Sequence, residues 1–184
     1  MSDPVTVCNL ALGFLGEKSI TSFEDASTAA ELCAVHYPPA VRAVLEERAW
    51  GFATRRGTLE NPETSGDFLL YTLPADVLRV LSCSATDWRL ERGRKLRTNV
   101  GGAVTYSAVF LVEDPKEWSP HFTRCVAARL AADLATPITS NAKLAEAMEV
   151  RYLRELRTAG AIDAVQGSSD LVGAAQSALA ARRY

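Results

Sequence analysis

The chain has 184 residues, which is long enough for one domain whose hydrophobic core needs neither a metal ion nor a disulfide. Its composition, 48% hydrophobic and 23% charged, is that of an ordinary globular protein, and a formal net charge of -2 excludes a general attraction to nucleic acid or anionic membranes. Four widely separated cysteines and two histidines lack zinc-site spacing, and a disulfide framework is a poor interpretation.

No segment has the pattern of a targeting or membrane sequence. The N-terminus lacks a basic stretch followed by an apolar run, and no stretch approaches ~18 uninterrupted apolar residues. We therefore expect no signal peptide and no membrane span. Three cysteines fall in helical apolar stripes, which predicts buried thiols in a reducing cytosol at Cys8, Cys33 and Cys125.

Two helices are predicted in the first fifty residues. Asp3-Pro4 is a typical helix start and Gly16 a typical end. A longer helix should follow from a cap at Asp25 or Ser27, with Pro38-Pro39 bending or breaking it because proline has no backbone N–H. The apolar stripe of this helix consists of Ala30, Ala34, Tyr37, Val41 and Leu45, with Cys33 and Val44 beside it.

Antiparallel strands are predicted between about residues 52 and 111. Residues 59–67 are rich in turn formers and indicate an exposed loop, and residues 77–82 indicate a strand or a short helix. Residues 68–73 and 104–110 indicate strands, the second with strict alternation. A hairpin is expected over residues 88–98, with Gly93 supplying a positive φ at its turn.

The C-terminal part predicts two more helices and an arm. One helix begins after Ser119-Pro120, carries Phe122, Val126, Leu130 and Leu134, and is expected to stop at Thr136-Pro137. The next should open near residue 139 and end near Gly160. The fold class is therefore α+β, mainly α, with a helical bundle and a small β insertion (about 52–111) in a domain spanning 1–166, and an extended arm at 167–184.

The arm is distinguished by its small residues. Its sequence begins with Gly167-Ser168-Ser169, which we interpret as a flexible joint. Too few apolar side chains follow for an independent core, so they are expected to become ordered on a partner. A self-packed or disordered terminal helix is the alternative. The predicted anchors are Leu171, Val172, Leu179 and Tyr184.

No catalytic, metal-binding or cofactor-binding set is predicted. Acid–base catalysis needs two groups with their pKa values pushed apart, and neither His36 with Glu46-Glu47 nor the carboxylates of residues 60, 63 and 67 is held in that way by any motif. P-loop, nucleophile-elbow and dinucleotide-binding motifs are missing from the sequence. We therefore expect a protein that is not an enzyme and uses no cofactor.

Five basic residues crowd the predicted hairpin next to Trp88. They could contact phosphates or an acidic partner, or they could be solubilising charges on an edge hairpin that discourage strand pairing. Both interpretations remain open at this point. The five residues are Arg89, Arg92, Arg94, Lys95 and Arg97.

Three strings carry a resemblance to a known family. They are VCNLALGFLGEKSITSFED (residues 7–25), HYPPAVRAVLEERAWGFATRR (36–56) and YTLPADVLRVL (71–81). With the helical segment from Trp118 they make the chain, over roughly residues 4–165, similar to the tail tubular protein A or head-to-tail adaptor family of short-tailed bacteriophages. Trp50 and Phe52, in the second string, would pack the insertion onto the bundle or serve a seam between protomers.

The resemblance implies a structural virion protein in the neck or tail, present in the host cytoplasm during assembly. It implies a homo-oligomeric ring, a dodecamer, below the portal protein and above the next tail or neck protein. DNA would pass through the ring without sequence-specific binding, and the C-terminal extension would lie along the portal. The basic residues of the hairpin would face this channel or a neighbouring copy of the chain. The alternative functions are a virion-associated cell-wall hydrolase and a cytosolic DNA-binding module.

Overall fold

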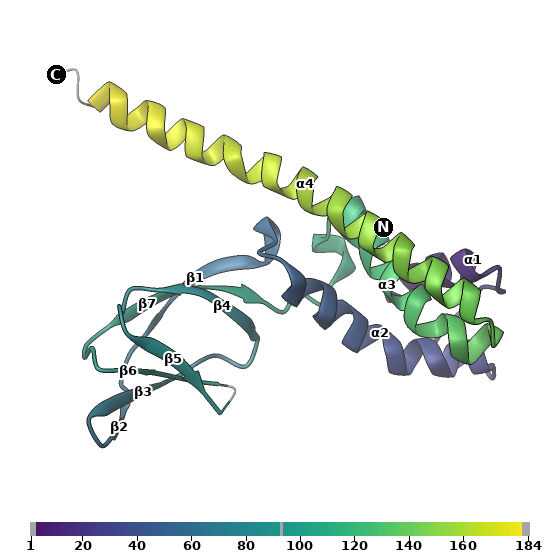
Figure 1. Ribbon diagram of the computed structural model, residues 1–184, viewed down its shortest axis with the longest axis horizontal. Helices are drawn as coiled ribbons and strands as arrows, with labels where there is room; N and C mark the ends of the chain where they lie inside the picture. The colour runs from purple at the N-terminus through teal and green to yellow at the C-terminus, as the bar shows by residue number, and fades with distance from the viewer. Residues whose placement is uncertain (1–2, 93, 182–184) are drawn as a thin grey trace. The chain divides into compact units, whose positions relative to one another are not determined.

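The computed structural model describes residues 3–92 and 94–181, with side chains described as far as residue 166. The chain divides into a helical unit, Met1–Val44 with Glu113–Tyr184, and a β unit, Leu45–Val112. The described residues form four α-helices and two small antiparallel sheets (Figure 1). The predicted α+β class with helix predominating is confirmed at this level.

The helical unit contains α1 (Pro4–Leu15), most of α2 (Thr28–Glu47), the short 3-10 helix η2 (Pro115–Glu117), α3 (Pro120–Thr139) and α4 (Ala142–Ala181). Helix α3 packs against both α1 and α4 (Figure 1). Its predicted stripe of Phe122, Val126, Leu130 and Leu134 is completely buried. Burial of this stripe therefore stabilises the helical unit through the hydrophobic effect.

The predicted helix boundaries are correct where a local capping contact defines them. The Asp3 carboxylate accepts a 2.8 Å hydrogen bond from the Thr6 amide, and the Ser119 hydroxyl accepts one of 3.2 Å from the Phe122 amide. Gly16 ends α1 with a φ of 77°, which glycine adopts without a steric penalty. Ser27 caps α2 through a 3.2 Å bond from the Ala30 amide.

Two predicted helix ends are wrong, and of the two alternatives predicted at Pro38-Pro39, a bend or a break, the break does not occur. Helix α2 runs through Pro38-Pro39, α3 passes Pro137 and ends at Thr139, and α4 continues through Gly160 to Ala181. Each proline removes one hydrogen bond, but water can satisfy the freed carbonyls of α2 because Ala34 and Val35, four residues back, are exposed. An interior glycine costs only about 1 kcal/mol, which the rest of a long helix offsets.

Side-chain hydrogen bonds hold the connection between α1 and α2. The Asn9 amide donates to the Ile20 carbonyl at 2.9 Å and accepts from the Ile20 amide at 2.8 Å. Asp25 accepts from both the backbone amide and the hydroxyl of Thr21, at 2.6 and 2.7 Å. These contacts fix the connection between the two helices, in which Ile20 is also buried.

The β unit contains two antiparallel sheets after a short 3-10 helix, η1 (Gly51–Ala53). Sheet A has the order β1-β7-β4, with β1 (Thr54–Leu59), β7 (Val104–Phe110) and β4 (Val77–Cys83). Sheet B has the order β2-β3-β6-β5, with β2 (Glu63–Ser65), β3 (Phe68–Thr72), β6 (Lys95–Thr98) and β5 (Trp88–Glu91). Both sheets contribute buried side chains to one hydrophobic core, including Leu96 and Tyr71 from sheet B and Val104 and Ala108 from sheet A.

The alternation of β7 sets the two faces of sheet A. Its even-numbered residues point into the shared core, and Thr105 and Ser107 point to the opposite, outer face. Opposite Tyr106 on β1 lies Gly57, where an added Cβ would stand 2.6 Å from the tyrosine ring. The ring therefore needs a glycine at this position.

The structure changes the sequence-based assignment in the middle of the chain. Part of the predicted loop at residues 59–67 is strand β2, whose three residues are all exposed. The ambiguous segment at 77–82 is strand β4. The hairpin of β5 and β6 is confirmed, with Arg92 at a φ of 44°, while Gly93 lies outside the described residues.

Candidate functional site

The basic hairpin lies on the outer face of sheet B. In the register of β5 and β6, Arg89 pairs with Arg97 and Glu91 with Lys95, whereas Leu96 and Thr98 on the other face are buried. Alternation therefore gathers the basic side chains of the two strands on one solvent-facing surface.

Two of the five basic residues already have partners within the sheet. Lys95 forms a 2.6 Å ion pair with Glu63 and a 2.9 Å hydrogen bond to the Thr72 hydroxyl. Arg97 pairs with Glu91 at 3.0 Å and lies 4.0 Å over the ring of Phe68. These contacts neutralise part of the charge and hold β2, β3, β5 and β6 together.

Arg94 is also engaged, through a 3.2 Å hydrogen bond to the Leu73 carbonyl. Arg89 and Arg92 are exposed, and neither forms an ion pair among the residues that the structure describes. A partner with negative charge would therefore meet mainly these two. Sequence reasoning missed the role of Glu63, because only the β2–β3–β6 pairing brings it next to Lys95.

The other residues singled out in the sequence differ in how far they are exposed. Trp50 is 1% exposed, which leaves it no free surface for a neighbouring protomer, and Phe52 is half-buried. His36 is half-buried on α2, and the carboxylates at residues 60, 63 and 67 are exposed. The four predicted arm anchors, Leu171, Val172, Leu179 and Tyr184, lie outside the residues with described side chains.

Cys8, Cys33 and Cys125 are buried thiols that form no disulfide among the described residues, and their burial is as predicted, while Cys83 is half-buried. Contact with the Cys33 thiol, together with burial, raises the pKa of Cys8. In the parts of the chain that are described, no three metal-ligating side chains gather into one group. No described helix combines the length and hydropathy needed to cross a bilayer.

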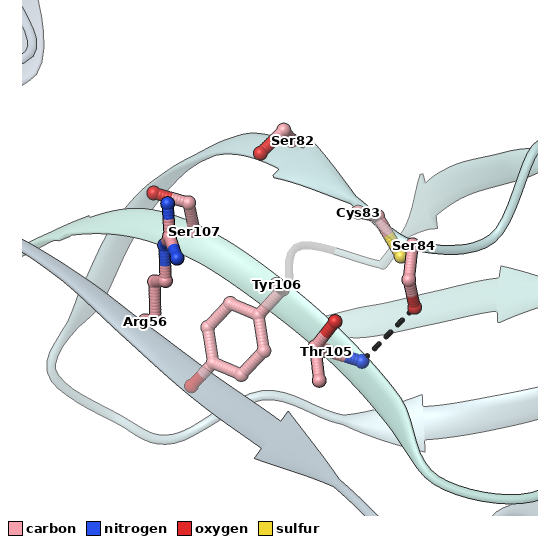
Figure 2. Close-up of a pocket in the computed structure, with 7 residues that line it drawn as sticks. All are labelled: Arg56, Ser82, Cys83, Ser84, Thr105, Tyr106 and Ser107. Carbon is pink, nitrogen blue, oxygen red and sulfur yellow. Dashed lines mark hydrogen bonds between the residues drawn. The ribbon is translucent and has the colours of Figure 1, made fainter. Parts of the chain in front are cut away.

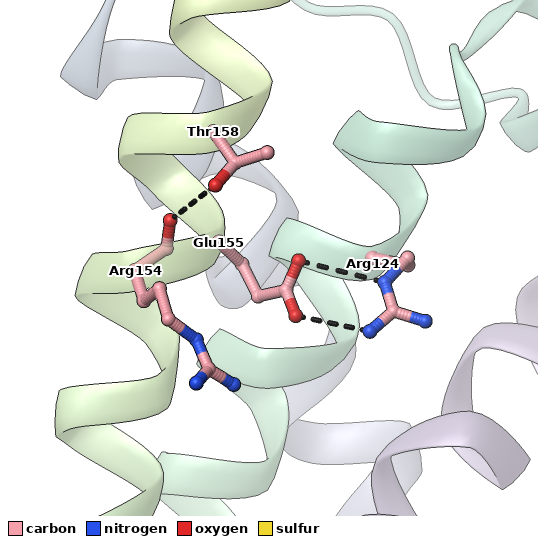
Figure 3. Close-up of polar contacts among 4 residues, drawn as sticks. All are labelled: Arg124, Arg154, Glu155 and Thr158. Atoms are coloured by element: carbon pink, nitrogen blue, oxygen red, sulfur yellow. Dashed lines mark hydrogen bonds and ion pairs between the residues drawn. The ribbon is translucent and has the colours of Figure 1, made fainter.

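A two-pronged ion pair joins α3 to α4. The Arg124 guanidinium donates to both carboxylate oxygens of Glu155, at 3.0 and 3.4 Å, while Arg154 projects away from this contact (Figure 3). Glu155 is 9% exposed, and the hydrogen bonds from Arg124 lower its pKa. This contact is structural, because the Arg124 guanidinium donates to both carboxylate oxygens and holds the carboxylate ionised.

The helical unit also has a mostly apolar depression of about 430 Å³ near the start of α3. It is lined by Thr6, Leu10, Trp118, Pro120, Thr123 and Arg124. Its lining contains no pair of groups suited to acid–base chemistry.

Comparison with known proteins gives no matching family model and no significantly similar curated protein.

Proposed function

We propose that the chain is a structural virion protein, a head-to-tail adaptor that forms a dodecameric ring below the portal and connects it to the next tail or neck protein. The observation that carries the proposal is that three sequence strings resemble the adaptor family and occur in the order expected for that family. In this proposal the chain is a helical bundle with a β insertion at about 52–111, an arm at 167–184 that lies along the portal, and a central channel for DNA.

The way the chain uses these strings supports a structural role. In the first string, Asn9 and Asp25 fix the backbone between α1 and α2. In the second, Tyr37 and Trp50 are 8% and 1% exposed. In the third, the buried Tyr71 donates its hydroxyl to the carbonyls of residues 100 and 102, at 3.1 and 2.8 Å. All of these side chains pack or fix turns, and a packing role is what an assembly protein requires of them.

The surface of sheet B supports passage of DNA without base recognition. Arg89 and Arg92 add positive charge at exposed positions, while Glu63 and Glu91 offset part of the charge of their neighbours. A surface of this kind can contact phosphates weakly and without a fixed register. Weak contact suits DNA that has to move past the protein.

Native mass measurements test the proposal. The full chain mixed with the portal protein of the same genome should give a species of about twelve copies bound to the portal ring, and the chain measured alone shows whether the ring forms without the portal. A chain that stays monomeric and leaves the portal unbound at every concentration would refute the adaptor role. Turnover of peptidoglycan would then favour the hydrolase, and salt-dependent binding of duplex DNA by the isolated monomer would favour the DNA-binding module.

A further inference from the structure

A second polar site lies on the outer face of sheet A. It is an open pocket of about 290 Å³. Its lining is rich in hydroxyl groups and contains one charged side chain, Arg56, and no carboxylate. The lining residues are Arg56, Ser82, Cys83, Ser84, Thr105, Tyr106 and Ser107 (Figure 2).

The register of sheet A builds this pocket. On the central strand β7, Ser107 pairs with Arg56 of β1 on one side and with Ser82 of β4 on the other. Directly opposite residues of paired strands project from the same face, so these three side chains form one row across the sheet. Figure 2 shows the Arg56 guanidinium beside the Ser107 hydroxyl, with the Tyr106 ring directed to the other side of the strand.

A second row of hydroxyls follows immediately. Thr105 pairs with Thr58 of β1, and Ser84 donates its amide to the Thr105 carbonyl at 2.8 Å. The Ser84 hydroxyl accepts a 3.1 Å hydrogen bond from the Thr105 amide. Because that bond uses a lone pair of the oxygen, the hydroxyl proton of Ser84 remains available to donate to a ligand.

The charge on this face has one sign. In the preceding row, Val109 pairs with Thr54 and Arg79, so the outer face of sheet A carries two arginines, several hydroxyl residues and no carboxylate. The Nε atom of Arg79 is buried and has no hydrogen-bond partner among the described residues. Arg56 is exposed and forms no ion pair in the described part of the chain.

We propose that this pocket binds a phosphate group, with the Arg56 guanidinium as the charged donor and the hydroxyls of Ser82 and Ser107, in the same row, as neutral donors. A guanidinium fork matches two phosphate oxygens, and the surrounding hydroxyls supply donors for the others. A carboxylate has only two oxygens and would leave some of these donors unused. The volume accommodates one phosphate group with a small part of the molecule that carries it.

The phosphate can belong to nucleic acid or to a small ester, and the experiment separates these sources. Inorganic phosphate is titrated into the 15N-labelled full chain at constant ionic strength, with acetate and chloride as comparison ions. Saturable amide shifts confined to residues 56, 82–84 and 105–107 are expected for phosphate only. A short duplex DNA is then titrated in the same way, and shifts of the same residues identify nucleic acid as a source.

Two variants with the same change of charge provide the matched comparison. Arg56→Gln should weaken phosphate binding by about tenfold or more, since it removes the charged donor. Arg55→Gln should leave binding unchanged, because Arg55 pairs with the core residue Ala108 and lies 5.5 Å from the ring of Phe110. Ser107→Ala should give an intermediate loss.

Three results would overturn the proposal. Equal effects of Arg55→Gln and Arg56→Gln on phosphate binding would show that binding depends on the overall charge of the protein and not on this pocket. Acetate or chloride shifts as large as those of phosphate would remove its selectivity, and shifts that never saturate would show that no site exists. The site does not depend on the adaptor role, so a failure of ring assembly leaves this test unaffected.

Discussion

Glu155 is the one carboxylate buried among the described residues, and its environment makes a prediction about stability and pH. Glu155→Gln removes one charge from the two-pronged contact with Arg124. The Arg124 side chain is 47% exposed, so solvent screens the pair and we expect a loss of about 1–2 kcal/mol in the free energy of unfolding at pH 7. Urea unfolding at equilibrium measures it.

The sign of the pH dependence follows from the lowered pKa of Glu155. A carboxylate with a folded pKa below its unfolded value contributes stability above the unfolded value, and this contribution is lost as the pH falls through the folded value. The difference between wild type and Glu155→Gln should therefore shrink from pH 7 to below about 4. Glu146→Gln, the same change at an exposed position of α4 that forms no ion pair among the described residues, is the control, and a difference that is constant with pH would contradict the assignment.

At the scale of the element, the helical stripes can be tested by truncation. Leu130 on α3 and Leu45 on α2 are both 0% exposed, so alanine at either position should leave a cavity and cost about 2–5 kcal/mol. Val35→Ala removes apolar atoms from a side chain that is 68% exposed and should change stability by less than about 0.5 kcal/mol. Thermal melts of the three variants measure this, and equal melting temperatures would mean that the stripes are wrongly placed.

The elements also show what the sequence can predict. Caps at Asp3, Gly16 and Ser119 are local, because the capping residue and its partner lie within a few positions, and all three were predictable. The continuation of helices through prolines was not, because it depends on exposure and on the rest of the helix. Strand β2 was missed since its three residues are all exposed and only pairing with β3 stabilises them.

The same distinction applies to the candidate sites. The crowding of five basic residues in one hairpin indicated a basic surface, but the pairing of Lys95 with Glu63 joins residues 32 positions apart and requires β6 to pair with the β2–β3 hairpin. The row of Arg56, Ser107 and Ser82 likewise spans β1, β7 and β4. No local motif marks it, so sequence analysis missed this pocket entirely.

The hairpin makes a prediction at this scale that rests on the adaptor role. Changing Arg94 or Lys95 would disturb contacts within sheet B, so Arg89→Glu with Arg92→Glu is the cleaner test. If these two residues face the channel, rings should assemble normally but hold DNA less well. The dependence of DNA binding on salt should fall by ~0.9 in log–log slope for each lost phosphate contact.

Lys18→Glu with Lys143→Glu makes the same change of charge at exposed positions of the helical unit and is the control. Failure of the Arg89 and Arg92 variant to assemble would indicate that the hairpin contacts a neighbouring copy. Normal assembly together with normal DNA retention would leave the hairpin as a solubilising edge.

At the scale of the whole molecule, the question is what the C-terminal part of the long helix α4 binds. Among the side chains of α4 that the structure describes, as far as residue 166, those buried in this unit include Met148, Tyr152 and Ala159. The backbone remains helical through Ala181, across the predicted joint at Gly167-Ser168-Ser169. The arm proposal therefore concerns what this extension binds, whether its backbone bends or not.

Deleting residues 168–184 tests that proposal. Because the described buried contacts of α4 remain, the melting temperature of the monomer should change little, whereas binding to portal-containing heads should be lost. Each Leu or Val anchor that becomes buried on the portal contributes roughly 1.5–3 kcal/mol, so Leu171→Ala with Leu179→Ala should weaken binding by at least about a hundredfold. Arg182→Ala with Arg183→Ala shortens two side chains of the same segment without removing an apolar anchor and should retain most of the binding. Full portal binding by the truncated chain would move the contact to the helical unit or the β unit, and a large fall in melting temperature would mean that the segment packs on its own unit.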